Sequence, residues 1–234
     1  MKNIILTSTL LAAGILIAPS VMATTPSCKG LTATIVGTSG PDLLTGTQGD
    51  DVIVGLGGND AIDGLGGNDT ICGNDGDDRI VGSAGNDTIY GNEGNDQISG
   101  GAGADNLVGG IGDDQISGNK GADTISGRAG NDSVDGGLGD DNISGDGGND
   151  IADGGAGIDV INGGDGKDSI SGGLDNDTIN GGAGSDDVSG DEGNDQIDAG
   201  TGTADNCIPD LVGTDVSSDC ETEDSESELE QNDG

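Results

Sequence analysis

The chain contains no histidine, tryptophan or phenylalanine, and Tyr90 is its single aromatic residue. Basic residues are also scarce, with 6 lysines and arginines against 45 acidic residues and a formal net charge of −39. With 51 glycines among 234 residues, an ordinary mixed core is excluded, because glycine loses much backbone entropy on folding. This charge balance disfavours nucleic acid and anionic lipid as partners and makes multivalent cations the natural counter-charge.

The N-terminal segment differs from the rest of the chain in composition. Residues 1–23 combine Lys2, an apolar stretch and a closing Ala23, which indicates a secretory signal peptide. A membrane anchor is the alternative, but Pro19 and Ser20 cut the apolar run short of the roughly 20 residues that a span needs. We therefore expect a secreted, extracellular protein.

Export would place the four cysteines in an oxidising compartment, and four cysteines allow three pairings. We favour Cys28–Cys72 and Cys207–Cys220, one bridge at each end of the central array described next, where a terminal coil has a neighbour on one side only. A zinc site is the alternative, but neither a C-x-x-C spacing nor a histidine supports it.

A nine-residue repeat fills residues 37–198 as 18 units without an insertion. Positions 1 and 6 are glycine and aspartate in every unit, position 4 is glycine except at Asp175, and position 8 is Leu, Ile or Val except at Ala152. We expect positions 1 and 4 to lie in turns where glycine adopts positive φ. Positions 7 to 9 mostly alternate polar, aliphatic and polar residues, which predicts a short strand with position 8 facing inward.

The repeat also predicts how the units stack. Two units make a coil of 18 residues, so the array predicts nine coils spaced by about 4.8 Å, with two interior columns of aliphatic side chains. In unit 13, Ile151 would face outward and Ala152 inward, and we expect weaker packing there. The predicted segments are a signal peptide (1–23), an N-terminal cap (24–36), the repeat array (37–198), a C-terminal cap with a disulfide (199–220) and a disordered acidic tail (221–234).

The invariant aspartate recurs beside turn carbonyl oxygens. Carboxylate and carbonyl oxygens on a flexible backbone, without nitrogen or sulfur ligands, favour Ca²⁺ over Mg²⁺. An Asx turn, in which each aspartate caps only its own turn, is the alternative, but 18 stacked carboxylates would repel one another without a cation. The candidate calcium ligands are the position-6 residues Asp42, Asp51, Asp60, Asp69, Asp78, Asp87, Asp96, Asp105, Asp114, Asp123, Asp132, Asp141, Asp150, Asp159, Asp168, Asp177, Asp186 and Asp195.

The units resemble the RTX (hemolysin-type) nonapeptide, G-G-x-G-x-D-x-U-x with U a large aliphatic residue, which binds calcium in a parallel β-helix. GGIGDDQIS (109–117), GGLGDDNIS (136–144) and GGAGSDDVS (181–189) match every specified position. The resemblance implies an all-β, right-handed parallel β-roll in which each ion lies between one turn and the turn two units on. Eighteen turns give 18 − 2 = 16 such pairs, hence up to about 16 Ca²⁺ ions held by the aspartates and by carbonyls near positions 1 and 3.

Two features set the N-terminal part of the array apart from its later units. Position 2 is Thr, Leu, Asn or Ser in the first seven units, so we expect these turns to bind calcium less tightly. A second stack forms from position 9 of the even-numbered units, whose first members are Val54, Cys72, Tyr90 and Val108. A Cys28–Cys72 bridge would bring residues 31–36 to this apolar patch as a capping strand.

The composition points to a non-enzymatic function. No credible nucleophile and base are present, since the chain lacks histidine and its cysteines are expected to be paired. We therefore expect a secreted calcium-binding rod that acts as a surface or matrix component, without membrane insertion and without catalytic residues. The alternatives are an ice-binding or adhesin-type roll, for which position 5 supplies asparagine in eight units but position 3 supplies no threonine, and an accessory of a hemolysin-like toxin.

Overall fold

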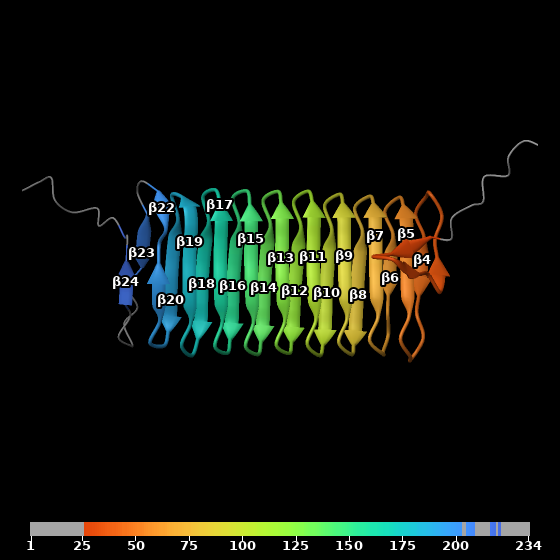
Figure 1. Ribbon diagram of the computed structural model, residues 1–234, viewed down its shortest axis with the longest axis horizontal. Coiled ribbons are helices and arrows are strands. Elements are labelled where there is room, and N and C mark those ends of the chain that lie inside the picture. The colour runs from red at the N-terminus through yellow and green to blue at the C-terminus, as the bar shows by residue number, and fades with distance from the viewer. Residues whose placement is uncertain (1–25, 203–204, 209–215, 219, 221–234) are drawn as a thin grey trace, which may run out of the picture.

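The computed structural model describes residues 26–202, 205–208, 216–218 and 220, and within these residues the chain is an all-β roll without helices. Two sheets of stacked strands face each other along the rod, and each coil contributes one strand to each sheet (Figure 1). The predicted signal peptide and acidic tail lie outside the described residues. In the described part of the chain, no helix is long and apolar enough to cross a membrane.

Most strands of the larger sheet contain six residues. Its members are β3 (Ile35–Val36), β5 (Val52–Gly57), β7 (Thr70–Asp75), β9 (Thr88–Glu93), β11 (Asn106–Ile111), β13 (Thr124–Ala129), β15 (Asn142–Gly147), β17 (Val160–Asp165), β19 (Thr178–Gly184), β21 (Gln196–Asp198), β22 (Thr201–Gly202) and β24 (Val216–Ser218).

The facing sheet contains ten strands. They are β4 (Leu43–Thr45), β6 (Ala61–Asp63), β8 (Arg79–Ala84), β10 (Gln97–Ala102), β12 (Gln115–Lys120), β14 (Ser133–Leu138), β16 (Ile151–Ala156), β18 (Ser169–Leu174), β20 (Asp187–Glu192) and β23 (Asn206–Ile208). A separate antiparallel pair is formed by β1 (Ser27–Cys28) and β2 (Leu31–Thr32).

The parallel register follows the repeat. Neighbouring strands of a sheet place residues 18 positions apart side by side, as with Ile98 beside Ile116 and Leu107 beside Ile125. The position-8 side chains of all 18 units form one buried cluster between the sheets. The predicted 18-residue coil and its two interior aliphatic columns are therefore confirmed.

The strands are longer than positions 7 to 9. A typical strand such as β7 covers positions 7 to 9 of one unit and positions 1 to 3 of the next. The extension is possible because positions 2 and 3 continue to pair with the neighbouring coil, as Asn74 does with Asn92 and Asp75 with Glu93. Only positions 4 to 6 remain as the bend between the two sheets.

Unit 13 departs from its neighbours as predicted. Ala152 is 2 % exposed and stands in the interior column between Val134 and Ile170, whereas Ile151 is 59 % exposed. The shorter side chain leaves fewer apolar contacts at this point of the core.

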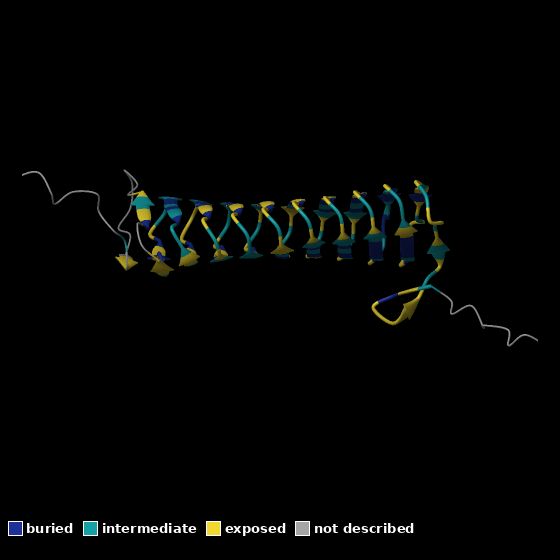
Figure 2. Ribbon diagram, turned by 90° about the horizontal axis from the view of Figure 1, so that it is seen from above, coloured by how far each residue is buried: buried dark blue, intermediate teal, exposed yellow. Residues whose placement is uncertain are grey.

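The N-terminal hairpin formed by β1 and β2 lies beside the roll (Figure 2). A disulfide joins Cys28 to Cys72 with a Cα–Cα distance of 5.7 Å, and both residues are buried with Val54 in the predicted outer patch. The capping strand is shorter than predicted, because only β3 continues the sheet while Leu31 belongs to the hairpin.

The C-terminal end continues the roll beyond residue 198. Strand β23 pairs with β20 and places Cys207 beside Val188, at the site of an interior position-8 residue. Cys207 is bonded to Cys220 with a Cα–Cα distance of 5.6 Å, so the second predicted disulfide is also present. Together the two bridges fasten both ends of the stack.

Candidate metal centre

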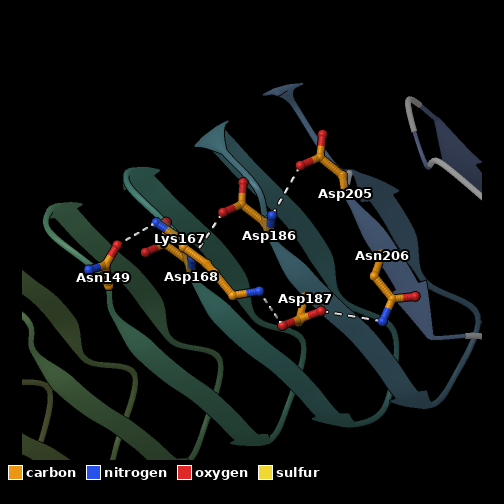
Figure 3. A network of polar contacts seen from close by, with 7 residues as sticks. All are labelled: Asn149, Lys167, Asp168, Asp186, Asp187, Asp205 and Asn206. Atoms are coloured by element: carbon orange, nitrogen blue, oxygen red, sulfur yellow. Dashed lines mark hydrogen bonds and ion pairs between the residues drawn. The ribbon is translucent and has the colours of Figure 1, made fainter. Parts of the chain in front are cut away.

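The position-6 aspartates form two rows, because successive units bend at opposite edges of the roll (Figure 1). Oδ1 of each interior aspartate accepts a hydrogen bond from the backbone N–H of the aspartate one coil earlier. Asp141 accepts from Asp123 at 2.7 Å, and Asp186 accepts from Asp168 at 2.9 Å (Figure 3). From Asp51 onward these residues are only 0–7 % exposed, so each carboxylate is buried in a fixed orientation.

The second carboxylate oxygen, Oδ2, has no such partner. At every ninth residue from Asp60 to Asp186, Oδ2 is buried and accepts no hydrogen bond from the described residues. Fifteen carboxylates share this condition. Leaving a buried polar atom unsatisfied costs about 1–3 kcal/mol, and more for a charged group, so the rows require an electropositive partner.

A backbone carbonyl oxygen lies beside each of these Oδ2 atoms. A carbon atom added to the Cα of Gly136 would stand 2.6 Å from Oδ2 of Asp141 and 2.6 Å from the carbonyl oxygen of Gly154 in the next coil. Two oxygens therefore border one small space that glycine leaves free. Carboxylate and carbonyl oxygens are the ligands that calcium takes in proteins, so the residues present fit this ion.

Burial dominates the titration of the interior carboxyls. It raises the pKa of Asp141 to about 7 and that of Asp114 to about 6, although the ladder hydrogen bond acts in the opposite direction. Repulsion from Asp123, Asp159 and Asp140 raises the pKa of Asp141 further. A cation beside Oδ2 would offset both effects, because it stabilises the ionised form.

The pKa of Asp51 is shifted in the opposite direction. Burial acts to raise its pKa, but hydrogen bonds from Thr47 and Thr34 outweigh burial and hold the pKa below the ordinary value for aspartate. The N–H of Thr47 donates to Oδ2 at 2.7 Å and the hydroxyl of Thr34 donates to Oδ1 at 3.1 Å. Asp42 and Asp51 thus differ from the predicted ligands between Asp60 and Asp186 in having protein donors at Oδ2.

The prediction that position 1 adopts positive φ is wrong. Left-handed backbone occurs at positions 2 and 4, for example at Gly137 (φ 104°) and Gly139 (φ 131°), while Gly136 at position 1 lies outside that region. Position 1 is glycine because a side chain would overlap Oδ2 and the carbonyl of the next coil. Asp175 replaces glycine at position 4 and adopts φ 81°, as expected for an aspartate that tolerates this backbone.

A second ladder at position 5 was not recognised from the sequence. Oδ1 of Asn131 accepts the N–H of Asn149 at 2.9 Å, and Oδ1 of Asn149 accepts the N–H of Lys167 at 2.8 Å (Figure 3). In this ladder, the N–H donor lies one coil after the side chain that accepts it. In the aspartate ladder, the donor lies one coil before. Its signal was present, since position 5 is asparagine in eight units and aspartate in four.

A nineteenth aspartate was also missed. Oδ1 of Asp205 accepts the N–H of Asp186 at 3.0 Å, and Asp205 is 2 % exposed (Figure 3). The separation is 19 residues, so one inserted residue hides Asp205 from a search at strict nine-residue spacing. The sequence AGTGTADNCI at 199–208 still shows the repeat once this insertion is allowed.

The described residues contain no cluster of three or more His, Cys, Asp or Glu side chains placed to hold a metal ion. Each candidate position instead offers one carboxylate and neighbouring backbone oxygens. Such a donor set suits a hard cation that accepts carbonyl ligands, whereas a structural zinc site relies on cysteine or histidine.

Comparison with protein families gives matches to the RTX calcium-binding nonapeptide repeat (4 copies). The matched segments are residues 36–71, 73–107, 108–143, 144–179 and 172–203. No curated protein matches the chain. Because the matched segments span well over half of the chain and coincide with the coils that carry the aspartate rows, the chain belongs to the RTX calcium-binding nonapeptide repeat family.

Proposed function

We propose that Oδ2 of the interior aspartates and the position-1 carbonyl oxygens of the next coil hold rows of Ca²⁺ ions along both edges of the roll. The observation that carries this proposal is the repeated juxtaposition of a buried Oδ2 that accepts no hydrogen bond and a backbone carbonyl oxygen of the next coil, as at Asp141 and Gly154. One ion for each carboxylate from Asp60 to Asp195 amounts to about 16 ions, and their charge of +32 would offset most of the formal −39.

The choice of calcium follows from the ligands. Backbone carbonyls in a glycine-rich bend tolerate the variable coordination of Ca²⁺, whereas Mg²⁺ demands a tighter octahedron and gives up its water reluctantly. The family to which the chain belongs supports the same ion.

Ion binding and folding are coupled in this account. Without a cation, fifteen buried carboxylates either keep an uncompensated charge or take up protons, and both destabilise the roll at neutral pH. Calcium bound only by the folded state would stabilise that state in proportion to its concentration. The roll would therefore fold where calcium is millimolar and remain unfolded where it is scarce.

The proposed location is extracellular. Both disulfides, Cys28–Cys72 and Cys207–Cys220, belong to an oxidising compartment, and the composition of residues 1–23 favours export. Such a compartment also supplies the calcium that the aspartate rows need.

The proposed role is structural and non-enzymatic, as a rigid component of a surface or matrix. The carboxylates are engaged in the stacking of coils, which leaves them unsuited to act on a substrate. The position-5 asparagines, which raised the ice-binding alternative, accept backbone N–H groups such as that of Asn149. Their abundance thus has a structural explanation in the turn.

Far-UV circular dichroism during a calcium titration tests the proposal. We expect a cooperative gain of β signal at about 0.1–1 mM Ca²⁺, the range of extracellular modules, and no comparable gain with Mg²⁺ at the same concentrations. A protein already fully folded in chelator, or one that responds equally to Mg²⁺, would contradict the proposed function.

A further inference from the structure

The first two turns of the array have a different backbone from all later ones. Position 2 adopts left-handed φ in each of units 3 to 18, whether it is glycine or not, as at Leu56 (φ 82°) and Asn74 (φ 77°). In units 1 and 2 this position is Thr38 and Thr47, and neither lies in the left-handed region. Threonine is β-branched and strongly disfavours positive φ, so the sequence itself selects the second backbone.

This difference decides what Oδ2 of the aspartate meets. The N–H of Thr38 donates to Oδ2 of Asp42 at 2.6 Å and its hydroxyl donates to the same oxygen at 2.9 Å. The N–H of Thr47 donates to Oδ2 of Asp51 at 2.7 Å. In the turns from Asp60 to Asp186, no described residue donates to Oδ2. The oxygen that needs a cation elsewhere is therefore already satisfied in these two turns.

The threonine hydroxyls hold this arrangement in place. Oγ1 of Thr47 accepts the N–H of Gly49 at 3.2 Å and donates to its carbonyl oxygen at 3.2 Å, and Oγ1 of Thr38 likewise accepts the N–H of Gly40 at 3.3 Å. Both glycines lie outside the left-handed region that position 4 adopts in most later turns. Each threonine therefore closes its turn from position 2 to position 4.

The other carboxylate oxygen of Asp51, Oδ1, also has a donor from the N-terminal segment. Interior aspartates accept the backbone N–H of the preceding coil at Oδ1, but no aspartate precedes Asp51 by 18 residues. The hydroxyl of Thr34 donates to Oδ1 of Asp51 at 3.1 Å instead and accepts the N–H of Val52 at 3.0 Å. Both oxygens of Asp51 thus have protein donors.

We infer that the turns of Asp42 and Asp51 bind no calcium, and that they form a metal-independent cap on which the calcium-dependent coils are stacked. The inference rests on the proposed function, in which the other position-6 carboxylates hold ions at Oδ2. It revises the set of ligands implied by the resemblance, because two of the 18 aspartates serve the fold without an ion.

Counting bound ions by native mass spectrometry of the calcium-loaded protein tests this inference. Asp51→Asn should leave the count unchanged, because the amide oxygen still accepts from Thr47 and the amide nitrogen can donate to the hydroxyl of Thr34. Asp141→Asn is the matched control, with the same loss of charge in an interior turn, and should lower the count by one.

The converse variant is Thr47→Gly, which makes unit 2 read GGQGDDVIV and should raise the count by one. An unchanged count in this variant would overturn the claim that threonine excludes the ion.

Two further outcomes distinguish a failure of this inference from a failure of the proposed calcium binding. If Asp51→Asn and Asp141→Asn each lose one ion, the inference is wrong while calcium binding by the rows stands. If Asp141→Asn loses no ion, the proposed ligand role of the interior aspartates fails, and the inference fails with it.

Discussion

The backbone N–H of Asp123 donates to Oδ1 of Asp141 at 2.7 Å, while Oδ2 of Asp141 faces the space bordered by the Gly154 carbonyl and meets no donor from the described residues. One oxygen of the side chain therefore joins two coils, and the other is left for a cation. The repeat of this relationship along both edges explains why aspartate is invariant at position 6. Glutamate would place its oxygens one methylene farther out, and asparagine would lack the charge.

Substitution of Asp141 by asparagine should have opposite effects with and without calcium. With calcium, we expect a loss of about 1–3 kcal/mol in the free energy of unfolding, because an ionic ligand is removed. Without calcium, Asp141→Asn should be at least as stable as the parent, because the neutral amide carries no charge to desolvate. Urea denaturation measures the value in calcium, and the β signal in circular dichroism compares the two proteins in chelator.

Asp140→Asn is the matched control for this reversal. Asp140 occupies position 5, is exposed, and accepts the N–H of Ile158 at 2.9 Å through an oxygen that asparagine also provides. We expect no more than about 0.5 kcal/mol of change in calcium, as for ordinary surface substitutions, and an unchanged β signal in chelator. A loss in Asp140→Asn equal to that in Asp141→Asn would show that net charge matters and the Oδ2 site does not.

Substitution of Gly136 by alanine should disrupt one ion position by steric overlap alone. The added carbon would stand 2.6 Å from Oδ2 of Asp141 and from the Gly154 carbonyl oxygen, and φ at Gly136 is outside the left-handed region. We expect a loss of about 1–3 kcal/mol, typical of overpacking, together with a weaker calcium response in circular dichroism.

Gly147→Ala provides the comparison for Gly136→Ala. At Gly147 the nearest atom to an added carbon is the carbonyl oxygen of Arg128 at 3.7 Å, an ordinary van der Waals distance, and φ is again outside the left-handed region. This variant should match the parent within about 0.5 kcal/mol. Equal damage from both substitutions would mean that glycine is needed for backbone freedom and not for the space beside Oδ2.

The metal-free protein should become more stable as the pH falls from 8 to 5. Burial raises the pKa of Asp96 and Asp141 to about 7, above the ordinary value near 3.9, so the folded state binds these protons more tightly than the unfolded state does. The stability that protonation of these two carboxyls contributes to the folded state is fully present below the unfolded pKa. It is lost as the pH rises through about 7. Circular dichroism in calcium-free buffer measures the effect, and pH 5 keeps the protein above its pI of 4.1.

Calcium should reverse this pH dependence. The ion needs the carboxylates ionised, so the concentration of calcium that folds the protein should increase as the pH falls below about 6, where groups such as Asp114 (pKa about 6) take up protons. A calcium midpoint independent of pH between 5 and 8 would contradict a ligand role for these buried carboxyls.

The periodic features of the fold were predictable because each repeat enforces the same geometry. Ile98 and Ile116 occupy one interior column and Asp123 and Asp141 one ladder, and both relations follow from an 18-residue coil. The backbone conformation was less accessible, because glycine at position 1 is compatible with both positive φ and close approach. The φ of Gly136 and the position of Oδ2 relative to it distinguish these reasons.

The ends of the roll were also less predictable than its middle. Asp205 was hidden by one inserted residue, and the role of Thr38 depends on which way its N–H points. The places of the cysteines at the two ends of the array nevertheless identified both disulfides, because a terminal coil has a neighbour on one side only and is stabilised by a covalent bond.

Hydrogen exchange in chelator should distinguish the N-terminal cap from the middle of the roll. In the parent, we expect residues 34–54 to keep partial protection, since the Cys28–Cys72 bridge spans 44 residues and a closed loop of this size is worth about 4 kcal/mol in the chain-entropy model. Residues 100–150 should exchange rapidly under the same conditions. Mass spectrometry of proteolytic peptides measures the hydrogen exchange of both regions in one sample.

Cys28→Ser combined with Cys72→Ser provides the control for that experiment. This double variant should lose the protection of residues 34–54 in chelator and regain a protected middle when calcium is added. Equal exchange of the two regions in the chelated parent would contradict a cap that persists without calcium.

The most direct test of the account is a crystal structure of the protein grown in millimolar calcium, with anomalous scattering used to locate the ions. We predict two rows of calcium peaks beside Oδ2 of the interior aspartates from Asp60 onward, with no peak beside Asp42 or Asp51. Peaks confined to exposed carboxylates such as Asp140, or an absence of ions beside Asp141, would contradict the claim that the buried aspartate rows hold calcium.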